Sequence, residues 1–218
     1  DLPVTLTGLQ VPAPWNLAMI DLVKRPPDQA YAYPDSSGSG VRVYVIDTGI
    51  VSNNPQLDGR VLPGVSFVDG DASTSDCYGH GTHVAGTIAS TSYGVAKLAN
   101  VVPVRVFNCA GGGATETKVI KAIDWAIANK PEGTAAVINM SLGLECSWYC
   151  SNLPMLTAVQ RAVAANFVVV VSAGNSGLNA CTFAPAAAPS ALTVGAVNKS
   201  DLESTWSNFG PCVDLYAP

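Results

Sequence analysis

The sequence predicts an α/β fold in which a mostly parallel, twisted sheet is covered by helices on both faces. Strand-like runs alternate with runs of helical periodicity along the chain, which is typical of parallel sheets. The run Phe167–Ser172 is almost entirely β-branched, as expected of a strand that is covered on both faces. Apolar residues make up 48% of the 218 residues and charged residues only 12%, so the chain can form one sizeable core.

The predicted elements are separated by polar or glycine-rich stretches. The turn Ser36–Gly40 leads into the first core strand, and the loop Asp69–Ser75 precedes a pair of histidines. Thr115 can cap a helix whose apolar residues recur at helical spacing, and Pro131 ends it. We therefore predict strands over residues 41–47, 61–68, 101–107, 136–140, 167–172 and 191–197, and helices over 84–90, 115–130 and 156–166.

Composition excludes several classes of partner. The net charge of −5 leaves no basic patch, which argues against nucleic acid. The longest apolar run, Phe167–Val171, is too short to cross a bilayer, so we expect no membrane partner.

The chain begins at Asp1 without an initiator Met, so we expect any signal or pro-segment to have been removed. The six cysteines include no Cys-x2-Cys pair, which favours disulfides in an oxidising, secreted compartment.

The stretch Asp76–Thr87 holds the two histidines of the chain, His80 and His83, among glycines and small apolar residues. We place His80 in the first turn of a helix that continues through Val84–Ser90. Three interpretations compete. The histidines can be ordinary structural residues, they can join Cys77 in a zinc site, or His80 can act as a general base.

A carboxylate elsewhere in the chain favours the catalytic interpretation. The apolar run 41–47 ends in Asp47, which is followed by Thr48 and Gly49. Asp47 therefore lies at the carboxyl end of a strand, where open α/β sheets form their sites. Two independent motifs in this order are much rarer by chance than one.

The Asp47 and His80 motifs, in this order, resemble those of the subtilase family of serine proteases, close to its proteinase K and aqualysin branch. The resemblance covers residues 12–218, so residues 1–11 are predicted to form an N-terminal extension and residues 12–218 a partial catalytic domain. It implies a subtilisin-like fold that is incomplete at the C-terminus.

The resemblance also implies roles for individual residues. Asp47 would orient His80, and His80 would act as the base. Asn175, which taken alone is an ordinary turn residue after a glycine, matches the family's oxyanion donor. His83 is predicted to be structural and packed within its helix.

Two stretches match the walls of a peptide-binding cleft. The run Gly111, Gly112 and Gly113 is either a plain flexible loop or, as in the family, an edge strand that pairs with the substrate. Ser141, Leu142 and Gly143 match one wall of the pocket for the residue before the cleaved bond. Leu144 stands where the family has a second glycine, and we expect it to narrow or cap this pocket.

The resemblance assigns disulfides and a calcium site. It pairs Cys77 with Cys109 and Cys181 with Cys212, which weighs against zinc; Cys146 and Cys150 have no counterpart, and we expect them to close a small loop. It also suggests that calcium binds two carbonyls, of Pro189 and Ala191, and the carboxylate of Asp214, the alternative being a solvated Asp214.

No segment of the sequence matches the Gly-Thr-Ser-Met-Ala run that carries the family's nucleophile. Three explanations are open: the serine lies on a separate piece held noncovalently, it lies on a segment absent from this sequence, or the chain is an inactive relative. We favour a missing piece. The predicted function is that of a secreted serine endopeptidase with peptide substrates, a serine-bearing C-terminal segment and a pro-segment or inhibitor as partners. The alternative is an inactive binding or structural protein.

Overall fold

A seven-stranded sheet forms the centre of the computed structural model, which describes residues 6–21, 28–146, 150 and 153–218. The strand order is β11-β10-β8-β6-β3-β5-β4, and every pairing in this sheet is parallel. Its strands are β3 (Arg42–Asp47), β4 (Val65–Ser66), β5 (Asn100–Arg105), β6 (Ala136–Met140), β8 (Phe167–Ser172), β10 (Leu192–Ala196) and β11 (Leu215–Ala217). The predicted parallel α/β fold is confirmed.

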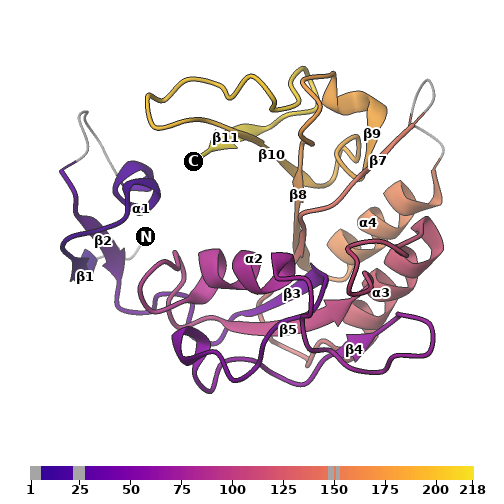
Figure 1. Cartoon of the computed structure of the whole chain (residues 1–218), viewed down its shortest axis with the longest axis horizontal. Helices are drawn as coiled ribbons and strands as arrows, with labels where there is room; N and C mark the ends of the chain where they lie inside the picture. The colour runs from indigo at the N-terminus through magenta and orange to yellow at the C-terminus, as the bar shows by residue number, and fades with distance from the viewer. Residues whose placement is uncertain (1–5, 22–27, 147–149, 151–152) are drawn as a thin grey trace.

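Helices cover the sheet on both faces, as Figure 1 shows. The side chains of β3 alternate between two cores because successive residues of a strand point to opposite faces. Val43 and Val45 pack in a cluster with α2 (His80–Ala89). Tyr44 and Ile46 pack in the larger cluster with α3 (Glu116–Asn129) and α4 (Pro154–Ala164).

The helix α3 begins where the sequence predicts. Thr115 Oγ1 accepts a hydrogen bond from the Lys118 backbone N–H, which satisfies one of the free amides of the first turn. Val119, Ile123 and Ala126 recur at helical spacing on the buried face.

Smaller elements flank the main sheet. The strand β1 (Leu6–Gln10) pairs antiparallel with β2 (Tyr31–Pro34), and these strands lie with α1 (Trp15–Ile20) at one side of the molecule in Figure 1. The strand β7 (Leu144–Glu145) pairs antiparallel with β9 (Phe183–Ala184). Two short 3₁₀ helices, Pro55–Leu57 and Ala180–Thr182, complete the described elements.

Two parts of the chain differ from the prediction. A single strand over residues 61–68 is wrong, because only Val65–Ser66 forms a strand and Val61 makes an isolated bridge to Val101. Pro63 has no backbone N–H to donate to a ladder, which explains the interruption. The β1–β2 pairing was not predicted, since we assigned no strand to either segment.

All three predicted disulfides are present, and none of the cysteines is free. They join Cys77 to Cys109, Cys146 to Cys150 and Cys181 to Cys212. Among the described residues, no helix has the length and apolar character needed to cross a membrane.

Candidate active site

Asp47 and His80 come together from two different elements. Asp47 ends β3, and His80 is the first residue of α2. His80 Nδ1 lies 2.7 Å from Asp47 Oδ1 and 2.9 Å from Asp47 Oδ2. Asp47 is completely buried, whereas 46% of the His80 side chain is exposed. The carboxylate of the pair therefore lies inside the protein, and the imidazole reaches the surface.

The close approach of α2 to β3 depends on a glycine. A Cβ atom on Gly81 would lie 2.3 Å from the Gly49 carbonyl oxygen and 3.1 Å from Asp47 Cβ. Any larger residue at position 81 would push the helix, and His80 with it, away from the carboxylate.

The hydrogen bonds of Asp47 set the protonation of the imidazole. Asp47 Oδ1 also accepts a hydrogen bond of 2.7 Å from the Thr48 backbone N–H. An ionised carboxylate can only accept, so Nδ1 of His80 carries a proton and Nε2 of the neutral ring is free to take one. Burial raises the pKa of Asp47, and the hydrogen bonds from His80 and Thr48 oppose that rise.

A cleft of about 280 Å³ opens at this pair. Most of the predicted substrate-binding residues line it, because the carboxyl ends of the parallel strands β3 and β6 meet at one edge of the sheet. The lining residues are Asp47, Thr48, Tyr78, His80, Phe107, Gly111, Ser141, Leu142 and Gly143.

Within the described residues, the run from Gly111 to Gly113 forms a loop that pairs with no strand, and its pairing with a substrate stays a prediction. Its backbone is fastened to Asn108, whose carbonyl oxygen accepts from the Gly111 N–H and whose Oδ1 accepts from the Gly112 N–H. The Gly112 carbonyl in turn accepts from the Asn108 N–H. Gly111 lines the cleft, whereas Gly113 lines a neighbouring hollow with Lys118.

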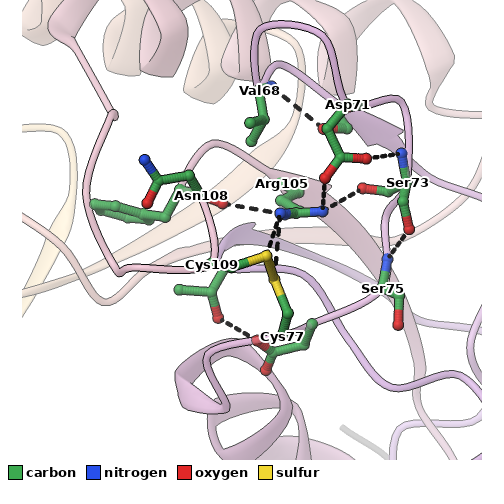
Figure 2. A network of polar contacts seen from close by, with 12 residues as sticks. Val68, Asp71, Ser73, Ser75, Cys77, Arg105, Asn108 and Cys109 are labelled. Carbon is green, nitrogen blue, oxygen red and sulfur yellow. Dashed lines mark hydrogen bonds and ion pairs between the residues drawn. A yellow bond between two sulfur atoms is a disulfide. The ribbon is translucent and has the colours of Figure 1, made fainter.

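A buried arginine fastens this loop to the histidine segment, as Figure 2 shows. Arg105 is 1% exposed at the end of β5, and its guanidinium uses all five of its N–H groups. Nε donates to the Phe107 carbonyl oxygen, and Nη1 donates to Asp71 Oδ2 and the Ser73 carbonyl oxygen. Nη2 lies 3.4 Å and 3.5 Å from the sulfurs of Cys77 and Cys109. One side chain thus joins three loops, two of which contribute residues to the cleft.

Asn175 lies on the exposed loop after β8 and is not among the residues that line the cleft. That loop is at the same edge of the sheet, since β8 is parallel to β6 with Val171 opposite Met140. A buried asparagine that the sequence did not reveal, Asn208, braces the loop. Its Nδ2 donates to the Ala173 carbonyl oxygen and its Oδ1 accepts from the Ser176 and Leu178 N–H groups.

Leu144 pairs through its backbone with Ala184 and lines a second cavity of about 110 Å³ together with Leu142 and Gly143, so its effect on the predicted pocket stays a prediction. One expectation around the site is wrong. His83 is not packed within its helix but is exposed. The buried stripe of α2 consists of Gly81, Ala85 and Ala89, and His83 lies on the opposite side of the helix.

The zinc interpretation of the histidines fails. Cys77 is bound in a disulfide, which removes its thiolate from any metal site. In the described part of the chain, no group of three or more His, Cys, Asp and Glu side chains could hold a metal ion.

The position and contacts of Asp76 were also not predicted from the sequence. Asp76 is 9% exposed and accepts hydrogen bonds from the segment that leads into α2. An acidic residue shortly before a helix is a recognised capping signal, which could have suggested this role. Arg105 and Asn208 carry no such signal, because most of the partners of their side chains come from distant parts of the sequence.

Comparisons with known proteins point to one family. The model of the Subtilase family (peptidase S8) matches residues 38–218. The chain is 44% identical over 220 residues to "Extracellular serine proteinase" of Thermus sp. (strain Rt41A), covering 100% of this chain and 51% of that protein. It is 44% identical over 215 residues to "Alkaline serine exoprotease A" of Vibrio alginolyticus, covering 99% and 39%. The chain thus spans about half or less of the length of these relatives.

A solved structure extends the likeness to three dimensions. The crystal structure of a cold adapted subtilisin-like serine proteinase superposes with a TM-score of 0.87 at 45% identity. The match covers 95% of this chain and 72% of that one. The family match and these identities together show that this chain belongs to the subtilase family.

Proposed function

We propose that the protein containing this chain is a secreted serine endopeptidase that hydrolyses peptide bonds in peptide or protein substrates. The observation that carries the proposal is the Asp47–His80 pair, in which the carboxylate fixes the Nδ1–H tautomer and leaves Nε2 free. An imidazole held in this way is suited to take a proton from a serine hydroxyl.

In the proposed reaction, His80 takes the proton of a serine as the serine attacks the peptide carbonyl, and later gives it to the leaving amine. Asp47 stabilises the imidazolium that forms between these steps. The amide of Asn175 donates to the oxyanion of the tetrahedral intermediate. The peptide lies between the Gly111–Gly113 loop and the Ser141–Gly143 segment.

We place the nucleophilic serine on a segment outside these 218 residues. Ser141 is the serine that lines the described cleft, and its Oγ accepts a hydrogen bond from Asn139 Nδ2. Within the described residues, no serine is hydrogen-bonded to His80. A groove of about 900 Å³ along the exposed side of α2, lined by His83, Gly86, Trp15 and Pro218 among others, leaves room for a further segment next to this helix.

Secretion is supported by the disulfides and by one relative's name. Six cysteines paired in three disulfides are typical of proteins that fold in an oxidising compartment. The Thermus relative is named an extracellular proteinase.

We also propose a structural calcium ion held by the carbonyls of Pro189 and Ala191 and by Asp214. The hydroxyl of Ser190, between the two carbonyl-bearing residues, is buried without a hydrogen-bond partner among the described residues. Asp214 Oδ2 accepts from the Thr193 N–H at 2.7 Å, which keeps the carboxylate beside this turn. Oxygen donors of this kind suit calcium, which would join the turn to β11 without taking part in the reaction.

The test is hydrolysis of a fluorogenic peptide by the complete protein and by its His80→Ala and Asp47→Asn variants. We expect kcat to fall by about 10⁴-fold in each. Asp124→Asn is the matched control, because Asp124 pairs with Arg161 at an exposed position between α3 and α4. Hydrolysis that persists in the His80→Ala variant would contradict the proposal.

A further inference from the structure

Asp76 is a buried carboxylate that receives five hydrogen bonds from neutral groups. Its Oδ1 accepts from Thr48 Oγ1 at 2.9 Å, from the Tyr78 N–H at 2.9 Å and from the Gly79 N–H at 2.7 Å. Its Oδ2 accepts from the Thr82 N–H at 2.9 Å and from Thr82 Oγ1 at 2.6 Å. In the described part of the chain, no Lys or Arg forms an ion pair with it.

These bonds reach both halves of the Asp47–His80 pair. The Tyr78, Gly79 and Thr82 amides belong to the residues on either side of His80. On the other side, Thr48 Oγ1 donates to Asp76 and accepts from the Gly81 N–H at 2.8 Å.

Thr48 completes the link to the catalytic carboxylate. Its backbone N–H donates to Asp47 Oδ1 at 2.7 Å. The end of β3 and the first turn of α2 are therefore attached to one carboxylate, Asp76, through direct bonds and through Thr48.

The charge of Asp76 suits this place. A negative charge at the N-terminus of a helix interacts favourably with the helix dipole. Burial by itself would raise the pKa of Asp76, but the hydrogen bonds from Thr82, Gly79 and Tyr78 outweigh it and hold that pKa below its ordinary value. Asp76 is consequently ionised throughout the pH range in which a histidine titrates.

We propose that Asp76 is a positioning residue for peptide-bond hydrolysis, which fixes the first turn of α2 against the end of β3 and so sets the geometry of the His80–Asp47 hydrogen bond. The inference rests on the function proposed above. Asp76 does not line the cleft, so it acts on the reaction through His80 and Asp47 rather than by touching the substrate.

The first test is Asp76→Asn in the complete protein. The amide keeps the shape of the side chain. Its N–H groups, however, face the N–H and O–H groups whose hydrogen bonds the carboxylate accepted. We expect kcat to fall by about 10–100-fold with KM changed by less than about twofold, because misplacing a catalytic group slows the chemical step without removing contacts to the substrate. Asp124→Asn makes the same chemical change at an exposed pair and should leave both constants unaltered.

A second pair of variants keeps the proposal testable if Asp76→Asn fails to fold. Thr48→Val removes the hydroxyl that connects Asp76 to the Gly81 N–H but keeps the backbone N–H that binds Asp47. Thr48→Ser keeps that hydroxyl. We expect kcat to fall in Thr48→Val and to be largely restored in Thr48→Ser.

A spectroscopic measurement tests the geometry independently of hydrolysis. In proton NMR spectra of the complete protein, the low-field Nδ1 proton of His80 is assigned by its loss in a His80→Gln variant. This signal should shift or broaden in Asp76→Asn and Thr48→Val but not in Asp124→Asn. The carbon-bound ring protons of His83, which is exposed on the same helix, serve as the internal reference.

The outcomes separate the two proposals. Wild-type kcat together with an unshifted His80 signal in both Asp76→Asn and Thr48→Val would overturn the positioning role. Equal changes at His80 and His83 would overturn it as well, because they would mean general damage to the helix. If the unaltered protein hydrolyses no peptide, the proposed function fails, while the His80 signal still decides what Asp76 does.

Discussion

The ring of Tyr78 lies so close to Gly111 that a Cβ atom on Gly111 would sit 2.6 Å from Tyr78 Cε2. Tyr78 lies two residues before His80, and Gly111 belongs to the loop that forms one side of the cleft. The contact joins the histidine segment to that loop at the cleft surface. The disulfide between Cys77 and Cys109 joins the same two segments a short distance away.

We therefore expect Gly111→Ala to change substrate binding more than stability. The φ of Gly111 is +76°, so alanine would add strain of about 1 kcal/mol. The new methyl group would also push the 58% exposed Tyr78 ring into the cleft, and we expect KM to rise about tenfold as substrate binding weakens. Steady-state kinetics and chemical denaturation measure the two effects.

Gly133→Ala is the matched control for this substitution. Gly133 has a φ of +73°, but a Cβ atom there would have nothing within 4 Å. Gly133→Ala should lose as much stability as Gly111→Ala and keep the wild-type KM. Equal KM values in the two variants would contradict a role for the Tyr78 contact.

Arg105 should contribute far more to stability than Arg161, the exposed arginine that pairs with Asp124 between α3 and α4. Arg105→Met leaves the partners of a buried guanidinium without their donor, and we expect a loss of about 3 kcal/mol. Arg161→Met removes an ion pair in which both side chains are nearly half exposed, which should cost about 0–1 kcal/mol. Urea unfolding of both variants checks the difference, and losses of equal size would contradict this account of the buried network.

The stability contributed by Asp76 should depend on pH in a definite direction. Its folded pKa is lowered, so its contribution is fully present above the unfolded value of about 3.9 and is lost as pH falls through the folded value. Asp76→Asn should cost about 1–3 kcal/mol at neutral pH, and the cost should shrink below pH of about 4. Unfolding free energies measured across this range would contradict the assignment if the cost stayed constant in acid.

The contribution of Asp47 to stability should depend on pH in the opposite direction. Burial raises its folded pKa, so the folded state binds more protons and the contribution of Asp47 to stability falls as pH rises from about 3.9 through the folded value. At neutral pH we expect Asp47→Asn to be at least as stable as the unaltered protein, although its kcat should fall as predicted above. A loss of stability at neutral pH in this variant would mean that the His80 bond outweighs the burial of the charge.

The proposed calcium ion predicts a link between metal and thermal stability. A chelator should lower the melting temperature of the unaltered protein, and added calcium should restore it. Asp214→Asn should melt at the same temperature with and without the chelator. A chelator effect that persists in this variant would place the ion elsewhere.

Local patterns explain how much of the fold was predictable. The β-branched run of β8, the Thr115 cap of α3 and the apolar run that ends at Asp47 each carry their information in a few adjacent residues. The β1–β2 pairing depends on contacts between separate segments, such as the hydrogen bond from the Tyr31 hydroxyl to the Val95 carbonyl. Neither strand shows a clear alternation of apolar and polar residues.

The same distinction, between local sequence patterns and contacts from separate segments, applies to the site. Asp47 and His80 stand out in sequence because each lies in a distinctive short motif, and the structure brings the two together. The residues that brace the surrounding loops are less visible. Arg105 has three of its five partners 28 to 34 positions away, and the side chain of Asn208 has partners 30 to 35 positions away, so only the folded chain reveals their roles.

The most direct test of the central claim is labelling of the complete protein with a fluorophosphonate, followed by mass spectrometry of the labelled peptide. We predict one modified serine on a segment outside these 218 residues, and loss of the label in the His80→Ala variant. No labelling of a protein with an intact Asp47–His80 pair, or labelling that survives the removal of His80, would contradict the account.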